Sequence, residues 1–588
     1  MVLNIFKIFE TIPIKDPIHI EDGILQHFKL PIEYLETKYE VKENLIADIE
    51  LCNDSSHNVF HKLMKPNNTF NECNLQQHKV YYTTDIKYLQ ETQDVIQNID
   101  QDLKDDKYEQ IVDLWKDTKQ NQNFLYKYAY MDWKILKFLN ENTMFLTFSA
   151  ISTLLTPILF FIVPVIIIII PYLILKFKGT SITFNQYYDL LKVIGRNHFI
   201  GKLLNGFSDF SLKSLGTTIF YIGTFIYQVY CNIQSCQRYY HNMKTVNNNV
   251  YDLSCYLENT IQNIQRFSVT ASQCPSYNGF VENAQSQALV LRELHSKIKN
   301  ITPFSHSVGT VIAFGDLLKQ YYCIFENNSY EEALCFSFGF NGYLENIHNI
   351  KQLWYQDKIH FAEFNENNET EIIQQSYALI NDENVNDEVT NSCKFDRNMI
   401  ISGPNASGKT TLLKSTLINI ILTQQFGCGF YEGCKIHPYS HIHSYLNIPD
   451  TSERDSLFQA ESRRCKDIID TIGAYPEDKG YRHFCIFDEL YSGTNPEEAS
   501  RSGYAFLTYL DQHSNVHYML TTHYVYICKK YKQSKRGQNY KMNAIIDTNG
   551  KIAFKYKLKK GVSKLRGAIH ILQNMNYPTK IIDSIKAQ

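Results

Sequence analysis

The sequence predicts a multidomain protein in which a mostly α-helical part, with one or two inserted transmembrane segments, precedes a C-terminal α/β domain. Three observations support this fold class. A short apolar strand, a glycine loop and an apolar-periodic helix follow one another over residues 399–422. Residues 144–175 contain no charged side chain. The segments on either side of this uncharged run have apolar residues at helical spacing.

The residues before the uncharged run divide into two expected segments. Residues 1–80 mix short apolar pieces with polar turns, which is typical of either a small α+β module or an irregular cap. Residues 81–143 have apolar side chains three, four and seven positions apart, as at Ile86, Leu89 and Ile96, and we expect a helical core there.

Residues 144–237 form the expected membrane region. The 32 uncharged residues of 144–175 exceed the roughly 20 that cross a bilayer. Three prolines in this run predict either a bent span or a re-entrant hairpin. Residues 214–237 are also uncharged. They predict either a second span or an amphipathic helix at the membrane interface. The segment between the two stretches carries lysines and an arginine, which favour a cytoplasmic location for it. This conflicts with a simple two-span topology, because the C-terminal domain is also expected to face the cytoplasm.

Residues 238–365 return to helical periodicity with few breakers, for example at Val250, Leu253 and Leu257. We expect long helices here that act as lever arms. Acidic, Asn-rich stretches at 365–369 and 381–388 read as surface loops. The C-terminal α/β domain is therefore assigned to residues 366–588.

The glycine loop of that domain matches the phosphate-binding pattern G-x-x-x-x-G-K-[ST]. Gly403 and Gly408 frame the pattern, so that backbone N–H groups and the N-terminus of the next helix surround a phosphate. Lys409 is expected to reach the β- and γ-phosphates, and the Thr410 hydroxyl to bind Mg²⁺. The predicted cofactors are ATP and Mg²⁺. The predicted nucleotide-binding residues are Gly403, Pro404, Asn405, Ala406, Ser407, Gly408, Lys409, Thr410 and Thr411.

Two further apolar strands end in polar residues suited to ATP hydrolysis. The strand that begins at His483 ends in Asp488 and Glu489. Asp488 is expected to hold Mg²⁺ through water, and Glu489 to act as the general base for the attacking water. The strand that begins at Val516 is followed by His523, which would sense the γ-phosphate or serve a structural role.

These residues resemble the MutS family, the dimeric ATPases of DNA mismatch repair. The matching motifs, in chain order, are Gly403-Pro404-Asn405, Gly408-Lys409-Thr410-Thr411, Ser456 to Glu461, Asp488-Glu489 with Ser492-Gly493-Thr494, Thr522-His523-Tyr524, and Gly561-Val562-Ser563. The resemblance implies a MutS-type ATPase domain that forms a homodimer and acts on DNA. It also implies that Ser456 contributes in trans to the nucleotide of the partner subunit.

The chain departs from the family pattern outside the ATPase domain. The first 80 residues contain no recognisable mismatch-reading domain, and the membrane region interrupts the helical core. We therefore expect a MutS-like ATPase anchored in a lipid bilayer, with its ATPase domain facing the cytoplasm, that acts on mismatched or branched DNA. The alternatives are an ATP-switched membrane scaffold without mismatch recognition and a transport-linked ATPase. The transporter signature Leu-Ser-Gly-Gly-Gln is absent before Asp488.

Composition adds limits on partners and compartment. The 588 residues carry a net charge of −3, so any contact with nucleic acid must be local. The 14 Cys show no zinc-site spacing, and no signal peptide is recognised, which predicts reduced thiols in a cytosolic compartment. Residues 529–566 carry 13 Lys/Arg against the single acid Asp547. This basic run indicates either a contact with nucleic acid or anionic lipid, or the solvated edge of a sheet.

Overall fold

The computed structural model forms two compact units. It describes residues 11–13, 16–53, 57–99, 108–179, 182–194, 212–379, 389–448, 456–546, 552–564, 572, 575 and 577–586. The first unit contains Met1–Gly23, Asp105–Ile261 and Leu289–Leu334, and the second contains Ile24–Lys104, Gln262–Ala288 and Cys335–Gln588. The expected loop at 381–388 lies outside the described residues. The four boundaries between the five segments expected from the sequence stay predictions.

The first unit is helical. Its elements are α7 (Tyr108–Trp115), the π-helix η3 (Lys116–Gln120), α8 (Phe124–Lys127), η4 (Lys134–Glu141), α9 (Thr143–Phe177), α10 (Phe184–Ile194), α14 (Val308–Glu326) and parts of α12 (Leu212–Thr270), α13 (Asn278–Ile298) and α15 (Asn328–Tyr355). Aromatic rings fill its core, as where Phe124 stacks on Phe325 at 4.3 Å. The buried amine of Lys119 pairs with Glu331 at 2.7 Å, which satisfies both charges.

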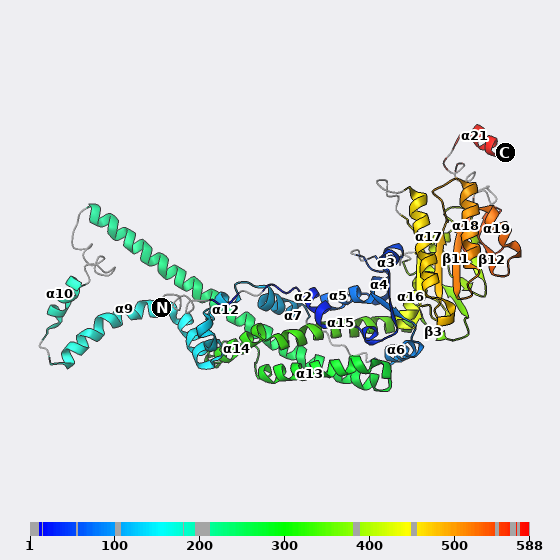
Figure 1. Ribbon diagram of the computed structural model, residues 1–588. Helices are drawn as coiled ribbons and strands as arrows, with labels where there is room; N and C mark the ends of the chain where they lie inside the picture. Colours follow the sequence, from blue (N-terminus) through cyan, green and yellow to red (C-terminus); the bar gives the residue numbers. More distant parts are fainter. Residues whose placement is uncertain are drawn as a thin grey trace, which may run out of the picture. The chain divides into compact units, whose positions relative to one another are not determined.

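The uncharged run forms a single continuous helix, α9, which Figure 1 shows in cyan. The hairpin that was one expectation for residues 144–175 is therefore not formed. Each proline removes only one helical hydrogen bond, so the helix continues through all three. Near its start Leu146 and Ala150 are buried, and a Cβ added at Gly315 of α14 would lie 2.0 Å from Thr147 Oγ1.

From Leu155 onward, most of the apolar side chains of α9 that the structure describes are exposed. Among the residues that the structure describes, one helix is long and apolar enough to cross a membrane, over Thr143–Val163 with a mean hydropathy of 2.1. The second uncharged stretch lies at the start of the long helix α12. The two helices pack together where the rings of Phe160 and Phe225 lie 5.3 Å apart. Length and composition alone make this weak evidence for a membrane span.

The second unit begins with a small α+β arrangement, one of the two expectations for the N-terminal residues. It contains α2 (Ile20–His27), shared with the first unit, η2 (Pro31–Tyr34), β1 (Lys38–Glu40), α3 (Glu43–Asp48), α4 (Val59–Met64), α5 (Thr69–His78), β2 (Tyr81–Thr83), α6 (Ile86–Asn98), η6 (Ala271–Gln273) and η7 (Pro275–Tyr277). Strand β2 packs on the C-terminal part of the unit, because Tyr82 donates its hydroxyl to the Ser440 carbonyl at 2.9 Å.

Two sheets build the C-terminal part of the second unit (Figure 1). The five-stranded sheet has the order β5-β4-β8-β3-β7, from Asn391–Lys394, Thr370–Gln375, Gly433–Ile436, His360–Phe364 and Cys428–Gly429. The six-stranded sheet has the order β13-β12-β6-β11-β10-β9, from Ile552–Lys560, Gly537–Ile546, Asn398–Ser402, Val516–Thr522, His483–Asp488 and His441–Tyr445. Its strands are parallel except β13, which runs antiparallel to β12.

Helices cover the six-stranded sheet and bury its strands. They are α16 (Lys409–Phe426), α17 (Leu457–Ala474), α18 (Pro496–Leu510) and α19 (Val525–Lys530). The short helices η9 (Glu477–Lys479), η10 (Tyr531–Gln533) and α21 (Thr579–Lys586) are the other helices of this part of the chain. Phe487, Leu507 and Tyr518 are fully buried in the core between strands and helices. Because β6, β10 and β11 are parallel neighbours, their carboxyl ends meet at one edge, where ligands bind in sheets of this kind.

Candidate active site

The glycine loop connects β6 to α16, as the sequence predicts. The buried strand β6 ends at Ser402, and α16 begins at Lys409. Gly408 has φ 88°, a left-handed conformation that glycine adopts without strain. A Cβ at Gly403 would lie only 2.8 Å from Ser407 Oγ. These two glycines therefore allow the loop to turn tightly at both ends, with the N-terminus of α16 facing the enclosed space.

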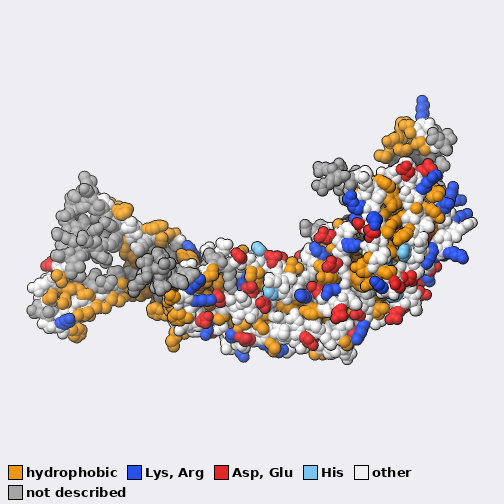
Figure 2. Space-filling model, viewed as in Figure 1, with side chains coloured by type: hydrophobic (Ala, Val, Ile, Leu, Met, Phe, Trp, Pro, Cys, Tyr) orange, Lys and Arg blue, Asp and Glu red, His pale blue; other side chains and the backbone are white. Residues whose placement is uncertain are grey.

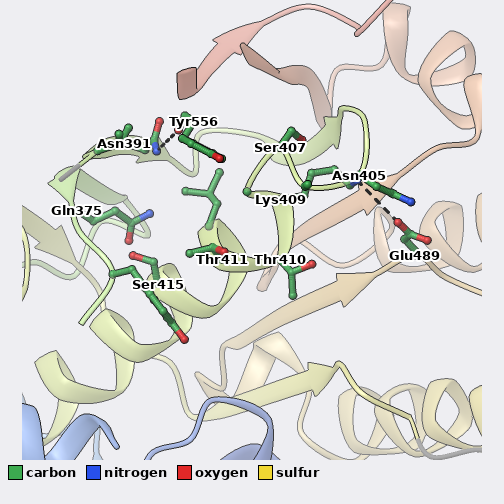
Figure 3. Close-up of a pocket in the computed structure, with 15 residues that line it drawn as sticks. Gln375, Asn391, Asn405, Ser407, Lys409, Thr410, Thr411, Ser415, Glu489 and Tyr556 are labelled. Carbon is green, nitrogen blue, oxygen red and sulfur yellow. Dashed lines mark hydrogen bonds and ion pairs between the residues drawn. The ribbon is translucent and has the colours of Figure 1, made fainter. Parts of the chain in front are cut away.

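Lys409 is buried at the centre of the site, with 5% of its surface exposed. Its Nζ atom lies 3.1 Å from the Gly403 carbonyl oxygen and 3.1 Å from Nε2 of His523. The same atom lies 3.8 Å from Oε1 of Glu489 (Figure 3). Burial lowers the pKa of Lys409, and the carboxylates of Glu489 and Asp488 oppose this shift. The ammonium group thus occupies the loop that a phosphate would fill.

Asp488 joins the ends of three neighbouring elements. Its Oδ2 atom accepts a hydrogen bond from Thr410 Oγ1 at 2.7 Å, and its Oδ1 atom accepts one from Thr521 Oγ1. A carboxylate beside a hydroxyl supplies the oxygen ligands that Mg²⁺ prefers. No cluster of three or more His, Cys, Asp or Glu that could hold a metal occurs in the described part of the chain.

Glu489 projects from a strained turn directly after β10. Its backbone has φ 52°, and its N–H donates to the Thr521 carbonyl at 3.1 Å. Its Oε1 atom lies 2.8 Å from Nε2 of His523. The hydrogen bond from His523 lowers the pKa of Glu489; burial opposes this shift, and the charges of His523 and Lys409 add to it. These contacts therefore favour the ionised carboxylate and orient it toward His523.

A cavity of about 560 Å³ extends from these residues along the glycine loop. Figure 3 shows Gln375, Asn391 and Tyr556 at one end and Glu489 at the other. The Asn391 side chain donates to the Tyr556 carbonyl at 2.9 Å, which ties β5 to the edge strand β13. The cavity therefore has an aromatic and amide-lined end beside a loop suited to phosphate, with a carboxylate beyond it. Gln375, Asn391, Thr521 and Tyr556 are not among the site residues that the sequence predicts.

Ser456 lies apart from this cavity within the same chain. It is the N-cap of α17 and forms a capping box with Gln459, so the residue has a clear local role. Its contribution in trans stays a prediction. Five positions later Glu461 is buried and accepts hydrogen bonds from Ser492 N at 3.0 Å and from Gly493 N at 3.2 Å. Glu461 thereby holds the loop that follows Glu489.

Comparisons with known proteins concern the part of the chain that contains most of this site. Residues 399–588 match the family model described as MutS domain V. DNA mismatch repair protein MutS of Bacteroides fragilis is 27% identical over 187 residues, which are 31% of this chain and 21% of the relative. Endonuclease MutS2 of Lactococcus lactis subsp. lactis is 29% identical over 204 residues, 34% of this chain and 25% of the relative. The similarity thus spans about a quarter or less of these relatives.

Proposed function

The chain belongs to the MutS family through residues 399–588, and from this premise we propose that it is a Mg²⁺-dependent ATPase that acts on DNA while anchored in a membrane. One observation carries the ATPase assignment. Lys409, Thr410 and Glu489 line one cavity beside the glycine loop. Asp488 contacts Thr410, and His523 contacts Lys409 and Glu489, so groups from three neighbouring strand ends meet at this site. This is the arrangement that phosphoryl transfer to water requires.

Each residue has a defined task in hydrolysis. Lys409 exchanges its contacts with loop carbonyls for contacts with the β- and γ-phosphates of ATP. Thr410 and Asp488 would hold Mg²⁺, which neutralises the phosphate charge that develops during the reaction. Glu489 accepts a proton from the attacking water, and His523 positions this carboxylate by its hydrogen bond.

The other end of the cavity suits the base of the nucleotide. The Tyr556 ring is 43% exposed and offers an aromatic face next to Gly408. The amide of Gln375 and the hydroxyl of Ser415 line the same region and offer polar atoms. A purine stacked on Tyr556 would leave its phosphates beside the glycine loop.

The membrane part of the proposal is supported by α9 and the start of α12. Their apolar side chains are exposed, including Phe161, Ile166 and Ile170 of α9 and Ile219 and Phe220 of α12. Exposed apolar surface of this extent is unfavourable in water and favourable in lipid. We place the ATPase domain on the cytoplasmic side, where ATP is available, and propose a dimer whose closure follows ATP binding.

The experiment that tests this function is steady-state ATP hydrolysis by the full-length protein in detergent. The rate is measured alone and with homoduplex, mismatched or branched DNA. A rate that one form of DNA changes supports action on DNA. A hydrolysis rate that is the same with and without each DNA would favour the ATP-switched membrane scaffold. The observation that supports this alternative is the exposed apolar helix α9. Absence of hydrolysis would refute the ATPase assignment itself.

A further inference from the structure

Lysines and arginines gather on one edge of the six-stranded sheet, which we call the basic edge. It consists of the eleven described Lys/Arg of residues 529–564, on α19, η10, β12, β13 and the segments beside them: Lys529, Lys530, Lys532, Lys535, Arg536, Lys541, Lys555, Lys557, Lys559, Lys560 and Lys564. All except the half-buried Lys541 are exposed. Figure 2 shows such side chains in blue at the side of the molecule where α19 and β12 lie in Figure 1.

The basic edge has no internal charge compensation. Within the part of the chain that the structure describes, none of its eleven side chains forms an ion pair. Lys541 of β12 lies directly opposite Lys559 of β13 in the register, and like charges in that position repel. Outside residues 529–566 the chain has 45 Lys/Arg (58 less 13) and 60 Asp/Glu (61 less 1). The positive charge is thus concentrated on one edge of an otherwise acidic protein.

We propose that the basic edge binds the phosphodiester backbone of DNA. The alternative occupant is an anionic membrane surface, but the strength of binding to such a surface grows with the apolar area that is buried in it as well as with charge. The exposed large apolar residues here are Val525, Tyr526, Ile545 and Tyr556. Tyr556 lines the nucleotide cavity, and Tyr526 is covered by Lys530, whose Nζ lies 5.5 Å from its ring centroid. The edge is therefore a charged surface with little apolar area to insert into lipid.

The strands of the basic edge also reach the nucleotide site. Strand β12 pairs with β6, the strand that leads into the glycine loop. A Cβ at Gly403 would lie 3.2 Å from Met542 of β12, and one at Gly408 would lie 3.1 Å from Tyr556 of β13. DNA bound to β12 and β13 would therefore contact strands that pack against the predicted phosphate-binding loop. This inference rests on the DNA-directed part of the proposed function and names the surface that carries it out.

The test neutralises three exposed lysines of the basic edge that have no part in the nucleotide cavity, in the triple variant Lys532→Gln, Lys535→Gln and Lys559→Gln. The matched control neutralises three exposed lysines elsewhere in the same unit, Lys29→Gln, Lys358→Gln and Lys479→Gln. Both variants are full-length and are held in nanodiscs of zwitterionic lipid. Fluorescence anisotropy measures their affinity for a labelled duplex of about 30 base pairs at salt concentrations from about 50 to 200 mM.

We expect the triple variant to bind DNA at least about tenfold more weakly and to lose about 3 from the slope of log affinity against log salt, since each phosphate contact contributes about 0.9. The control variant should have the DNA affinity and the salt dependence of the wild type. Both variants should keep the basal ATPase rate of the wild type. Unchanged affinity and slope would refute the basic edge as the DNA site while leaving the ATPase intact. An equal loss in the control, or lysine-dependent binding to phosphatidylserine vesicles without binding to DNA, would also overturn the proposal. If the wild type itself did not hydrolyse ATP, the proposed ATPase function would be refuted instead.

Discussion

The Nε2 atom of His523 lies 2.8 Å from Oε1 of Glu489. The same nitrogen lies 3.1 Å from Nζ of Lys409. The Nε2 atom carries either a proton or a lone pair, so it cannot donate to Glu489 and accept from Lys409 at once. Departure of Lys409 to the phosphates of ATP would leave His523 to serve Glu489 alone. We therefore expect nucleotide binding to complete the positioning of the proposed general base.

The first prediction concerns Glu489→Gln. The amide is nearly the same size but cannot accept a proton from water, so we expect hydrolysis to fall by about 10²- to 10⁴-fold while ATP stays bound. Single-turnover hydrolysis and nucleotide retention on a filter measure the two effects. Lys409→Ala should instead lose ATP binding. The exposed Glu497→Gln on α18 is the matched control. Hydrolysis by Glu489→Gln at the wild-type rate would mean that another group is the base.

The second prediction concerns the pH dependence of stability. The pKa of Glu489 is lowered in the folded protein, mainly by the hydrogen bond from His523. A lowered carboxyl pKa stabilises the folded state above the ordinary pKa of about 4.5, and this stabilisation is lost as pH falls through the lowered value. The difference in unfolding free energy between wild type and Glu489→Gln should thus be larger above about pH 4.5 and shrink as the pH falls below it. Urea unfolding without nucleotide measures it, and a difference that grew on acidification would contradict the assignment.

The third prediction concerns Thr521, which donates its hydroxyl to Asp488. Thr521→Val keeps the shape of the buried side chain and removes that donor. Groups that orient a metal-binding carboxylate typically affect metal affinity by about 10- to 100-fold. We expect the Mg²⁺ concentration for half-maximal hydrolysis to rise by about tenfold or more, with little change in the maximal rate.

A control separates this effect from a general loss of stability. Thr508→Val removes a hydroxyl that bonds only to the Tyr504 carbonyl on the exposed side of α18. Its Mg²⁺ dependence should equal that of the wild type. A Thr521→Val enzyme with a lower maximal rate and an unchanged Mg²⁺ requirement would show that Thr521 acts on catalysis by another route.

The sequence is sufficient to predict those site residues that lie close together along the chain. The glycine loop, Lys409 and Thr410 form one contiguous motif, and Asp488 and Glu489 directly follow a recognisable strand. Thr521, Tyr556 and Gln375 reach the site only through strand order and the packing of two sheets. Periodicity encodes which face of a strand is buried but not which strand lies next to it. These residues were therefore not identifiable before the fold was known.

The membrane region shows a second limit of sequence reasoning. Proline content left open a bend or a hairpin over residues 144–175, whereas the structure has one helix, α9. A proline removes one hydrogen bond, but whether the chain reverses depends on turn residues, and this run contains neither glycine nor a charged turn. The absence of turn chemistry was the better signal.

The fourth prediction concerns Glu461, a buried carboxylate that accepts hydrogen bonds from Ser492 and Gly493. Glu461→Gln leaves one amide group facing backbone N–H donors. We expect the free energy of unfolding to fall by about 1–3 kcal/mol, because buried donors lose their acceptor. Hydrolysis should fall more than ATP affinity, since the displaced loop directly follows Glu489. Thermal unfolding and nucleotide titration check these effects, and normal values for both would show that the loop is held by other contacts.

The last prediction concerns the exposed apolar surface of α9. A lysine near the centre of a membrane helix costs about 2.5–3.5 kcal/mol, whereas each Leu, Ile, Phe or Val contributes only about 0.3–0.6 kcal/mol of insertion. Replacing Leu155, Ile158 and Phe161 with lysine would therefore cost about 8–11 kcal/mol, which is comparable to the gain from some 20 apolar residues. All three side chains are exposed, so the folded bundle of the first unit should tolerate the change.

We expect alkaline carbonate to release the triple variant from membranes and to leave the wild type bound. Leu289→Lys, at an exposed position on α13, is the control and should stay in the membrane fraction. Release of the wild type by carbonate would show that α9 lies on a protein partner or on the membrane surface and does not cross the bilayer.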